Sequence, residues 1–440
     1  MGRVNLVAAA LCLTIGIGPR HANAQPEPAA RRVTVADAVA LALQHNPDAL
    51  SGDAEARGAE ASRAEARGGF GPKVHVDANA QVWDRPFLIP FGGGDIPVRD
   101  RFTWTAGVSL VQPITPLFAI NDQYMIQDFG VDVASIRRAA TRRDVALRVI
   151  EAYYRLLEAN RLSQVADTSV EQLDAQLRQA QSLLNNGVIG KNDLLRASLA
   201  LASARQRAIQ MRGQIDLARG QLAAAIGAPG SESFEPLPFA GEPPPSETST
   251  LRSAEGLAVA QRLELRELDR RIDQADKNVS FAKTKLLPQV NAVGNYTHTE
   301  GSQFQQLNAV YGGLFASWDV WDWGTTLGGI REAESRVSLA RLARKKAEDN
   351  VRLEARQAFV NATTEREALT VARAAVSQAE ENFRIVTKRF ENAAATSFDV
   401  VDAEALLTQT RGQVETALYD LLIAQAALAK ATGAPLPGDR

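Results

Sequence analysis

Two stretches of the chain carry a helical pattern for longer than any globular domain can hold. Residues 119–185 and 325–391 contain no proline, and the pattern is continuous through each of them. At about 1.5 Å of rise per residue, each stretch predicts a helix on the order of 100 Å long. The sequence therefore indicates a long, narrow molecule that is built mainly from helices.

The chain is also internally duplicated, and the two long helices are counterparts of one another. "GPKVHVDANAQ" at 71–81 resembles "LPQVNAVGNYT" at 287–297, and "DVALRVIEAYYRL" at 144–156 resembles "NVRLEARQAFVNA" at 350–362. Matching segments in a fixed order indicate one structural unit that occurs twice. We expect a first repeat at 25–227, a linker at 228–249, a second repeat at 250–434 and a tail at 435–440.

Each half is expected to contain the same order of elements. A short helix starts at Thr34, where Asp37 resembles the acid of a capping box, and its counterpart starts near Thr250. A medium helix, two strands, the long helix and a returning helix follow. The linker is too rich in Pro, Gly and Ser to be a helix. The expected bounds are 47–69 and 263–286 for the medium helices, 72–84, 101–112, 288–299 and 308–320 for the strands, and ends near 227 and 431 for the returning helices.

The first two predicted strands alternate polar and apolar side chains. "KVHVDANAQVW" at 73–83 alternates without a break, and "RFTWTAGVSLV" alternates in the same way. Period-two alternation is typical of a strand with one wet and one apolar face. The segment between them, "DRPFLIPFGGGDIPVRDR", is rich in Pro and Gly and is expected to be a loop. We predict an apolar face with Val76, Ala78, Val108 and Leu110, and a polar face with Asp77, Asn79, Thr105 and Ser109.

The apolar strand faces need a cover that the rest of the sequence does not supply. A half-buried strand of a soluble protein gives the same alternation, so one strand alone decides nothing. Four strands in two hairpins find no second sheet to cover them, and four strands cannot close a barrel. An open edge cannot stand in lipid, because its backbone N–H and C=O groups would be unsatisfied. We therefore expect several chains to pool their strands around a wet lumen.

The N-terminal segment favours export from the cytoplasm. Residues 1–24 combine Arg3, an apolar run and an A-x-A motif, which together are typical of a signal peptide. The run is shorter than the roughly 20 residues of a membrane span, which disfavours an N-terminal anchor. Cys12 is the only cysteine and lies in this run, without the context of a lipid-modified cysteine. Removal of Arg3 and Arg20 leaves 47 basic against 51 acidic residues, so charge gives no case for nucleic acid binding.

Catalytic and metal-binding motifs are lacking in the sequence. His45, His75 and His298 fall in different elements, and none has a spacing such as H-x-x-x-H. We expect the two strand histidines, His75 and His298, to be polar residues that face the lumen. Gly92–Gly94 precede no helix and are expected to form a flexible loop rather than a phosphate site. We predict no enzymatic activity, no cofactor and no metal site.

The order and duplication of these motifs resemble the TolC-type outer-membrane efflux protein family. The resemblance lies in "VTVADAVALALQHNPDAL", the "LLPQV" entry to a strand, the "VQPITPLF" and "WDVWDWG" exits, and the tips "GVIGKNDLLRA" and "SFDVVDAEALL". It covers essentially the whole mature chain. It implies a mainly α fold with a small β-barrel portion: a homotrimer with a twelve-stranded barrel, four strands from each chain, and a periplasmic α-helical tunnel. It also implies the outer membrane of a Gram-negative bacterium, extending into the periplasm, and work with an inner-membrane pump and a periplasmic adaptor.

Asp399 and Asp402 are the candidate periplasmic gate. They lie three residues apart at the start of a helix, so both project from one face. The alternative is helix-start chemistry, with Ser397 as the cap and an acid in the first turn. Asp193, the repeat counterpart of Asp399, supports that alternative, whereas Asp402 aligns with Arg196 and is not explained by capping. The resemblance matches both acids to charged rings at the periplasmic entrance.

The gate departs from the family pattern at two positions. Ala395 and Phe390 stand where some relatives have a basic residue and a tyrosine, so any lock needs other partners. Lys191, Asp193 and Arg196 are the candidates for that role.

The hairpin tips are the candidate surface for docking of the adaptor. The stretch 186–197 aligns with 392–403, and the tip segments 185–191 and 392–397 are rich in Gly, Ala, Ser and Asn. The docking residues that we predict are Gly187, Val188, Ile189, Gly190, Ala393, Ala394 and Ala395.

Three classes of function compete for this sequence. An export duct, serving a tripartite efflux pump or a type I secretion system, explains the signal peptide, repeat, strands and tips together. A periplasmic coiled-coil scaffold or adaptor without a pore would need the helices but not the two alternating hairpins. An exported enzyme lacks a candidate site. The sequence does not reveal the cargo, which can be a drug, a metal ion or a polypeptide.

Overall fold

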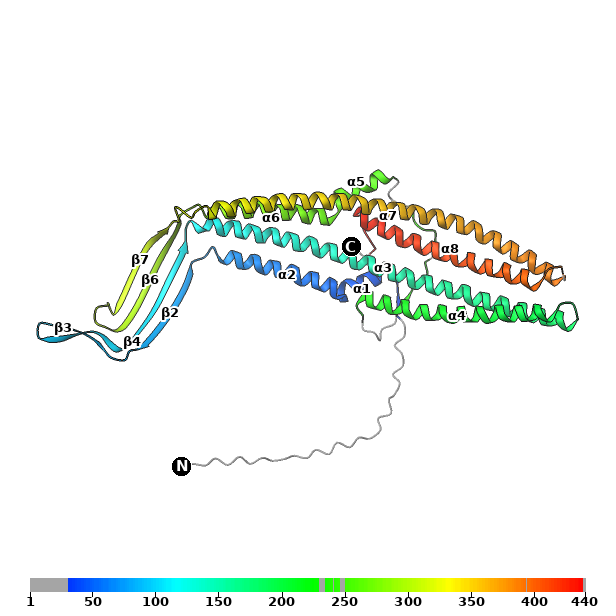
Figure 1. Ribbon diagram of the computed structural model, residues 1–440, viewed down its shortest axis with the longest axis horizontal. Helices are drawn as coiled ribbons and strands as arrows, with labels where there is room; N and C mark the ends of the chain where they lie inside the picture. The colour runs from blue at the N-terminus through cyan, green and yellow to red at the C-terminus, as the bar shows by residue number, and fades with distance from the viewer. Residues whose placement is uncertain (1–30, 229–233, 240, 246–249, 393, 438–440) are drawn as a thin grey trace, which may run out of the picture.

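The structure is a computed structural model, and Figure 1 shows a long, narrow molecule with a sheet at one end and helices that extend to the other. The expected signal peptide with Cys12, the tip residue Ala393, and parts of the expected linker and tail lie outside the described residues. The residues that the structure describes are 31–228, 234–239, 241–245, 250–392 and 394–437.

The two halves contain the same order of helices and strands, apart from one additional strand in the first half. The elements of the first half are α1 (Val35–His45), α2 (Pro47–Gly68), β2 (Lys73–Val82), β3 (Phe87–Phe91), β4 (Gly94–Pro113), α3 (Pro116–Asn185) and α4 (Lys191–Ile226). Those of the second half are α5 (Leu251–Gln261), α6 (Leu263–Thr284), β6 (Gln289–Ser302), β7 (Asn308–Ser317), α7 (Thr325–Glu391) and α8 (Ser397–Thr432). A small parallel sheet joins β1 (Arg31–Val33) to β5 (Phe234–Pro236).

The long helices form where the sequence predicts them, and each pairs with the helix that returns along it. Buried residues recur at seven-residue intervals, as at Ala166, Leu173 and Ala180 in α3. In α7 the same spacing relates Ala355 and Ala362 to Leu369. A seven-residue repeat keeps one stripe of a helix against its partner, as in coiled coils. The helical end of the molecule therefore consists of two antiparallel hairpins, α3–α4 and α7–α8 (Figure 1).

The short helices begin as the sequence predicts. Thr34 caps α1 in a capping box with Asp37, and Thr250 caps α5 in a capping box with Ser253. In each box the threonine hydroxyl accepts from the third helical N–H, which satisfies one of the unpaired donors at a helix start.

The sheet has the strand order β2-β4-β6-β7, with all neighbours antiparallel. The prediction of a loop between the first two strands is wrong, because β3 pairs with the first part of β4 there. Gly92 and Gly93 have φ of 60° and 95° and form the turn of this hairpin rather than a flexible loop. A glycine pair with positive φ suits a two-residue hairpin turn, and proline is tolerated in a strand at a sheet edge.

The main core lies near the middle of the molecule, where α1, α3, α4 and α8 meet β1 and β5. Tyr153 of α3 is almost fully buried there. Its hydroxyl lies 3.2 Å from the carbonyl oxygen of Val33 and 3.0 Å from that of Leu237. Burial raises the pKa of Tyr153 to about 12. This hydroxyl ties the small parallel sheet to the long helix.

We expect Tyr153→Phe to lower the free energy of unfolding by about 1 to 2 kcal/mol, because the buried carbonyl of Val33 and the partly buried carbonyl of Leu237 lose their donor. The unfolded pKa is 10.0 and the folded value is higher, so the contribution of Tyr153 is complete below pH 10. It is lost as the pH rises towards about 12. Denaturant unfolding of both proteins from pH 8 to 12 measures this, and a difference that does not shrink at high pH would contradict it.

Candidate functional site

Strands β2, β4, β6 and β7 of the main sheet present one mainly apolar and one mainly polar face. Across the sheet, Val76 pairs with Val108, Val108 with Tyr296, and Tyr296 with Val310. On the other face, Asn79 pairs with Thr105 and Thr105 with Thr299. Val76 is 69% exposed and Val310 is 79% exposed, although both belong to the apolar face. The sheet of a single chain therefore leaves a broad apolar surface without a cover.

The two strand histidines lie on opposite faces. His75 pairs with Ser109 on the polar face, as predicted. The same prediction is wrong for His298, which pairs with Ala106 and so lies on the apolar face. Nδ1 of His298 lies 2.8 Å from Oδ1 of Asn308. The ring centroid of His298 lies 4.9 Å from that of Trp104. His298 is thus part of an amphipathic group at the end of the sheet that lies away from the helices.

The outer strands of the sheet, β2 and β7, each pair on one side only among the described residues. Unpaired N–H and C=O groups along a strand edge are a template for pairing with another chain. The sheet order places these two free edges on opposite sides, so copies of the chain can be joined edge to edge.

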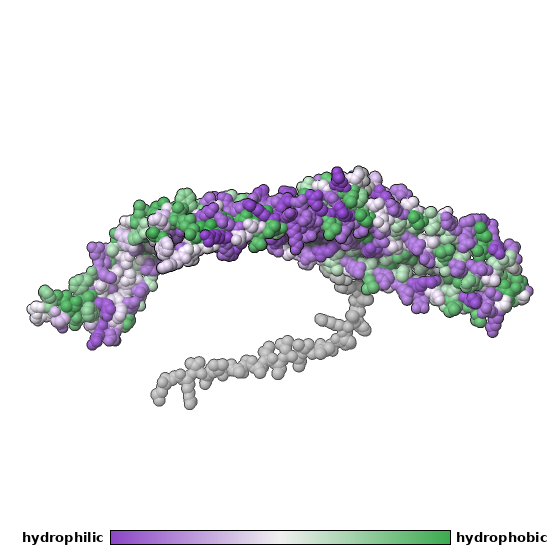
Figure 2. All heavy atoms as spheres, turned by 45° about the horizontal axis from the view of Figure 1, so that its top comes forward, coloured by the Kyte–Doolittle hydropathy of each residue, from purple (hydrophilic) through white to green (hydrophobic). Residues whose placement is uncertain are grey.

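Aromatic side chains are exposed where β7 leads into α7. Trp318, Trp321 and Trp323 are all exposed, and Trp323 reaches 88%. The rings of Trp321 and Trp323 lie 5.8 Å apart in an edge-to-face arrangement. Tryptophan is enriched at membrane–water interfaces, where its ring is apolar and its N–H is polar. Figure 2 shows apolar atoms gathered over this junction and over the far end of the sheet, whereas the middle of the molecule is largely hydrophilic.

Among the described residues, no helix has both the length and the apolar character that crossing a membrane requires. The described residues also contain no group of three or more His, Cys, Asp or Glu side chains suited to a metal ion.

At the opposite end of the molecule, the two hairpin tips pack against one another. Ala180 and Ala197 of the first hairpin form one apolar cluster with Phe390 and Val400 of the second. Phe390 is buried in this cluster, so it cannot act as an exposed gate residue in the way that a tyrosine hydroxyl could. The first turn, between α3 and α4, depends on Gly187 with φ of 71°, which satisfies the carbonyl oxygens at the end of α3.

Asp399 takes part in the start of α8. Its carboxylate accepts from the backbone N–H of Thr396 at 2.8 Å and from the Thr396 hydroxyl at 2.8 Å. These hydrogen bonds, first to the backbone and then to the side chain, lower the pKa of Asp399. Thr396 is therefore the cap, and the prediction of Ser397 as the cap is wrong by one residue. Ser397 is the first helical residue and is buried.

The other candidate gate residues, as far as the structure describes them, form no ion pair with one another in the single chain. Gly190 occupies the position that corresponds to Thr396, so Asp193 has no side-chain cap to bond with. Arg196 lies over Phe398, with its guanidinium carbon 5.5 Å from the ring centroid. Within the described residues no ion pair joins Lys191, Asp193 or Arg196 to Asp399 or Asp402. Asp402 is exposed.

A polar layer between the two hairpins was not predicted from the sequence. Glu404 of α8 is almost fully buried and accepts hydrogen bonds from the hydroxyls of Ser169, at 2.5 Å, and Thr408, at 2.7 Å. Buried side-chain atoms of Gln172 and Gln176 have no hydrogen-bond partner nearby. A sequence signal for this polar layer was available: Ser169 and Gln176 lie seven residues apart, and both are among the buried residues of α3.

If the tips dock a partner, as the family resemblance implies, bulky replacements there should abolish export and leave the oligomer and the sheet intact. Gly187→Val puts a branched side chain at a positive φ, which costs about 1 to 2 kcal/mol locally. Ala394→Trp fills an exposed position of the second tip, where a partner is expected to approach closely. Gly213→Val is the control, because that glycine also has open space around it but lies in α4, away from the tip. Export that survives both tip variants would place the docking surface elsewhere.

The family model described as "Outer membrane efflux protein" matches residues 38–228 and 256–434 of this chain. The outer membrane efflux protein BepC of Brucella suis is 20% identical over 409 residues, which cover 92% of this chain and 86% of BepC.

Solved structures share the fold at similarly low identity. The outer-membrane channel OprN has a TM-score of 0.78 at 20% identity, over 91% of this chain and 90% of OprN. The outer membrane protein VceC of Vibrio cholerae has a TM-score of 0.77 at 18% identity, over 91% of this chain and 96% of VceC.

Proposed function

The chain belongs to the outer membrane efflux protein family, and we propose that three copies of it assemble into the exit duct of a tripartite export machine. As a member of this family it is an outer-membrane transport protein and not an enzyme. The helices account for a duct that extends from the membrane into the periplasm, because α3 alone has 70 residues and is on the order of 100 Å long.

One observation carries the proposal: an amphipathic sheet with two free edges stands at the end of a bundle of very long helices. Lipid requires that every backbone polar group be paired, which a closed barrel achieves and an open sheet does not. Joining β7 of one chain to β2 of the next in a ring of three closes a barrel of twelve strands. Val76, Ala78, Val108 and Leu110 then face lipid, and Asp77, Asn79, Thr105 and Ser109 face the lumen.

The hairpin tips are the proposed contact with a periplasmic adaptor, which connects the duct to an inner-membrane pump. The surface offered consists of Gly187, Val188, Ile189 and Gly190 from the first tip, and Ala394 and Ala395 from the second, with Ala393 outside the described residues. Small residues allow partner helices to approach the backbone closely. Asp399 and Asp402 are the proposed gate inside the same end, with Lys191, Asp193 and Arg196 as partners supplied across the interface between neighbouring chains.

Fractionation of cells tests this proposal. We expect the protein in the detergent-extracted outer membrane, as an oligomer of three copies that survives cold sodium dodecyl sulfate and dissociates on heating. A scaffold or adaptor without a pore would use the helices but has no use for the apolar sheet. Recovery as a monomer in the soluble periplasmic fraction would therefore reject the duct and favour that alternative.

A further inference from the structure

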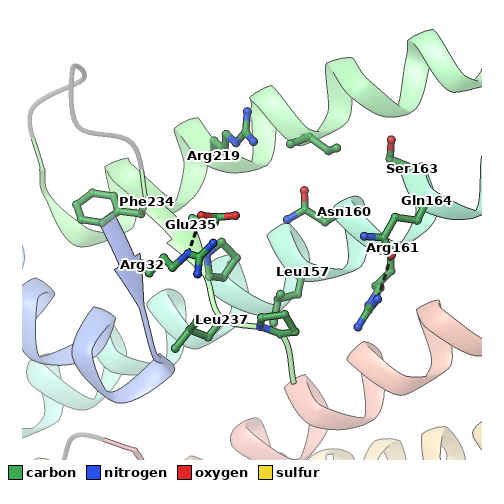
Figure 3. A pocket seen from close by; sticks show the side chains of 13 residues that line it. Arg32, Leu157, Asn160, Arg161, Ser163, Gln164, Arg219, Phe234, Glu235 and Leu237 are labelled. Carbon is green, nitrogen blue, oxygen red and sulfur yellow. Dashed lines mark hydrogen bonds and ion pairs between the residues drawn. The ribbon is translucent and has the colours of Figure 1, made fainter. Parts of the chain in front are cut away.

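A cavity of about 490 Å³ lies beside the core in the middle of the molecule, far from both the main sheet and the hairpin tips. Its walls come from α3, α4, β1 and the segment 234–238 (Figure 3). Leu157, Ile215, Phe234 and Leu237 contribute apolar surface to it. None of the lining residues belongs to the main sheet or to the hairpin tips.

The charge around the cavity is positive. Arg32, Arg161 and Arg219 line it, and Glu235 is the only acid among the lining residues. Arg32 pairs with Glu235 at 3.3 Å, and Arg219 pairs with the exposed Asp216 at 3.3 Å. Arg161 donates to the side-chain oxygen of Gln164 at 3.0 Å. A guanidinium has five N–H donors, so each of the three arginines keeps further donors after these contacts.

Two neutral polar side chains on α3 add to these donors. Ser163 is 5% exposed, and its hydroxyl has no hydrogen-bond partner within the part of the chain that the structure describes. Some hydroxyls on the long helices bond instead to a preceding carbonyl, as Thr168 does with the carbonyl oxygen of Gln164 at 2.9 Å. Asn160 likewise has no side-chain partner among the described residues. Both side chains point from α3 towards α4 in Figure 3.

We propose that this cavity binds a small amphipathic monocarboxylate, meaning an apolar group that carries one carboxylate. The apolar walls hold the body of the ligand, while Arg219, Asn160 and Ser163 donate hydrogen bonds to its carboxylate. A guanidinium matches a carboxylate in geometry and charge. Glu235 in the same cavity disfavours a doubly charged phosphate. This site is independent of the proposed duct, because none of its residues belongs to the sheet faces or the gate.

The test uses the full-length protein in lipid nanodiscs and the probe 4-fluorophenylacetate, followed by fluorine NMR. The neutral 4-fluorophenylacetamide and the dianionic 4-fluorophenyl phosphate are the comparison ligands. Arg219→Gln and Ser163→Ala are the variants. Arg205→Gln is the matched control, because Arg205 also lies on α4 and pairs with an aspartate, Asp174, at 3.3 Å, but does not line the cavity.

We expect the acid to bind at least about tenfold more tightly than the amide, because a hydrogen bond to a charged group is worth more than a neutral one. Arg219→Gln should weaken binding of the acid by about tenfold and Ser163→Ala by several fold, while Arg205→Gln leaves it unchanged. All variants should elute as the same oligomer as the wild type. Equal binding of acid and amide, tighter binding of the phosphate, no binding of the acid, or equal effects of Arg219→Gln and Arg205→Gln would each overturn the proposal.

Discussion

Val108→Lys is expected to remove most of the assembled protein from the outer membrane. Val108 lies in the part of β4 that pairs with both β2 and β6, between Val76 and Tyr296 on the apolar face. A lysine on a lipid-facing position near the midplane costs about 2 to 4 kcal/mol, and a trimer carries three of them. The measurement is the amount of heat-modifiable oligomer in outer-membrane extracts of cells that express each protein.

Ser109→Lys is the matched control, because the adjacent residue points to the polar face, where it pairs with His75 and Asn295. A lysine there should leave the amount of oligomer near the wild-type level and change only the conductance of the channel. Loss of the oligomer to the same extent in both variants would mean that the two faces of the strand are not distinguished by lipid.

Neutralising the gate is the second large effect that we expect. Three copies would place six carboxylates, from Asp399 and Asp402, around one narrow opening, and this negative charge should attract cations. In planar bilayers the wild-type channel should be cation-selective and blocked by multivalent cations from the periplasmic side. The double variant Asp399→Ala and Asp402→Ala should lose this block and keep the conductance of the barrel.

Two single variants separate the gate from the helix start. Asp402→Asn removes a charge and leaves the capping box of Thr396 and Asp399 in place, so it should already weaken the block. Asp216→Asn is a control, because this exposed acid lies far along α4. If the double variant keeps wild-type block and selectivity, the two acids serve only the start of α8 and the constriction lies elsewhere.

Low pH should affect the helix start in a defined direction. The pKa of Asp399 lies below its ordinary value of 3.8, because Thr396 donates to the charged carboxylate. The stabilisation that this cap gives is therefore present above pH 3.8 and is lost as the pH falls through the lower folded value. We expect loss of this cap to change the conductance only below pH 3.8, and Asp399→Ala should remove that acid-dependent change, which conductance recorded over a pH series measures.

Much of the architecture was predictable, because the long helices and the strand faces each follow from a repeating pattern of residues in the sequence. The absence of proline and the continuous helical pattern are local signals, and together with the small-residue tips they predicted the two hairpins. The alternation of polar and apolar residues along the strands is also a local signal, and it predicted the two faces of the sheet. The hairpin of β3 and β4 was missed because Pro90, Pro97 and the glycines are typical of loops, yet pairing at the edge of a sheet tolerates both.

The positions of single polar residues were harder to predict. His298 shares its parity with Gly294 and Tyr296, so strict alternation would have placed it on the apolar face. Its polar character suggested the lumen, but near the end of the strand it is accommodated by Trp104 and Asn308. Burial of Glu404 follows from packing of one hairpin on the other, which no local pattern of α8 encodes. The predicted cap, Ser397, differs by one residue from the observed cap, Thr396, because serine and threonine are both good caps.

Disulfide cross-linking across the strand edges tests most directly whether three chains share one barrel. Cys12 is the only cysteine, and it lies in the segment expected to be removed, so the background is free of thiols. Val76→Cys on β2 is combined in turn with a cysteine at Val310, Gly312 or Leu314 on β7, which lie on the same face. Asp77→Cys with Leu314→Cys, on opposite faces, is the control.

We predict that at least one same-face pair yields a ladder that ends at a covalent trimer after boiling, in outer-membrane extracts, and that the control pair yields none. Absence of intermolecular bands in every same-face pair, with the protein in the soluble periplasmic fraction, would contradict the account.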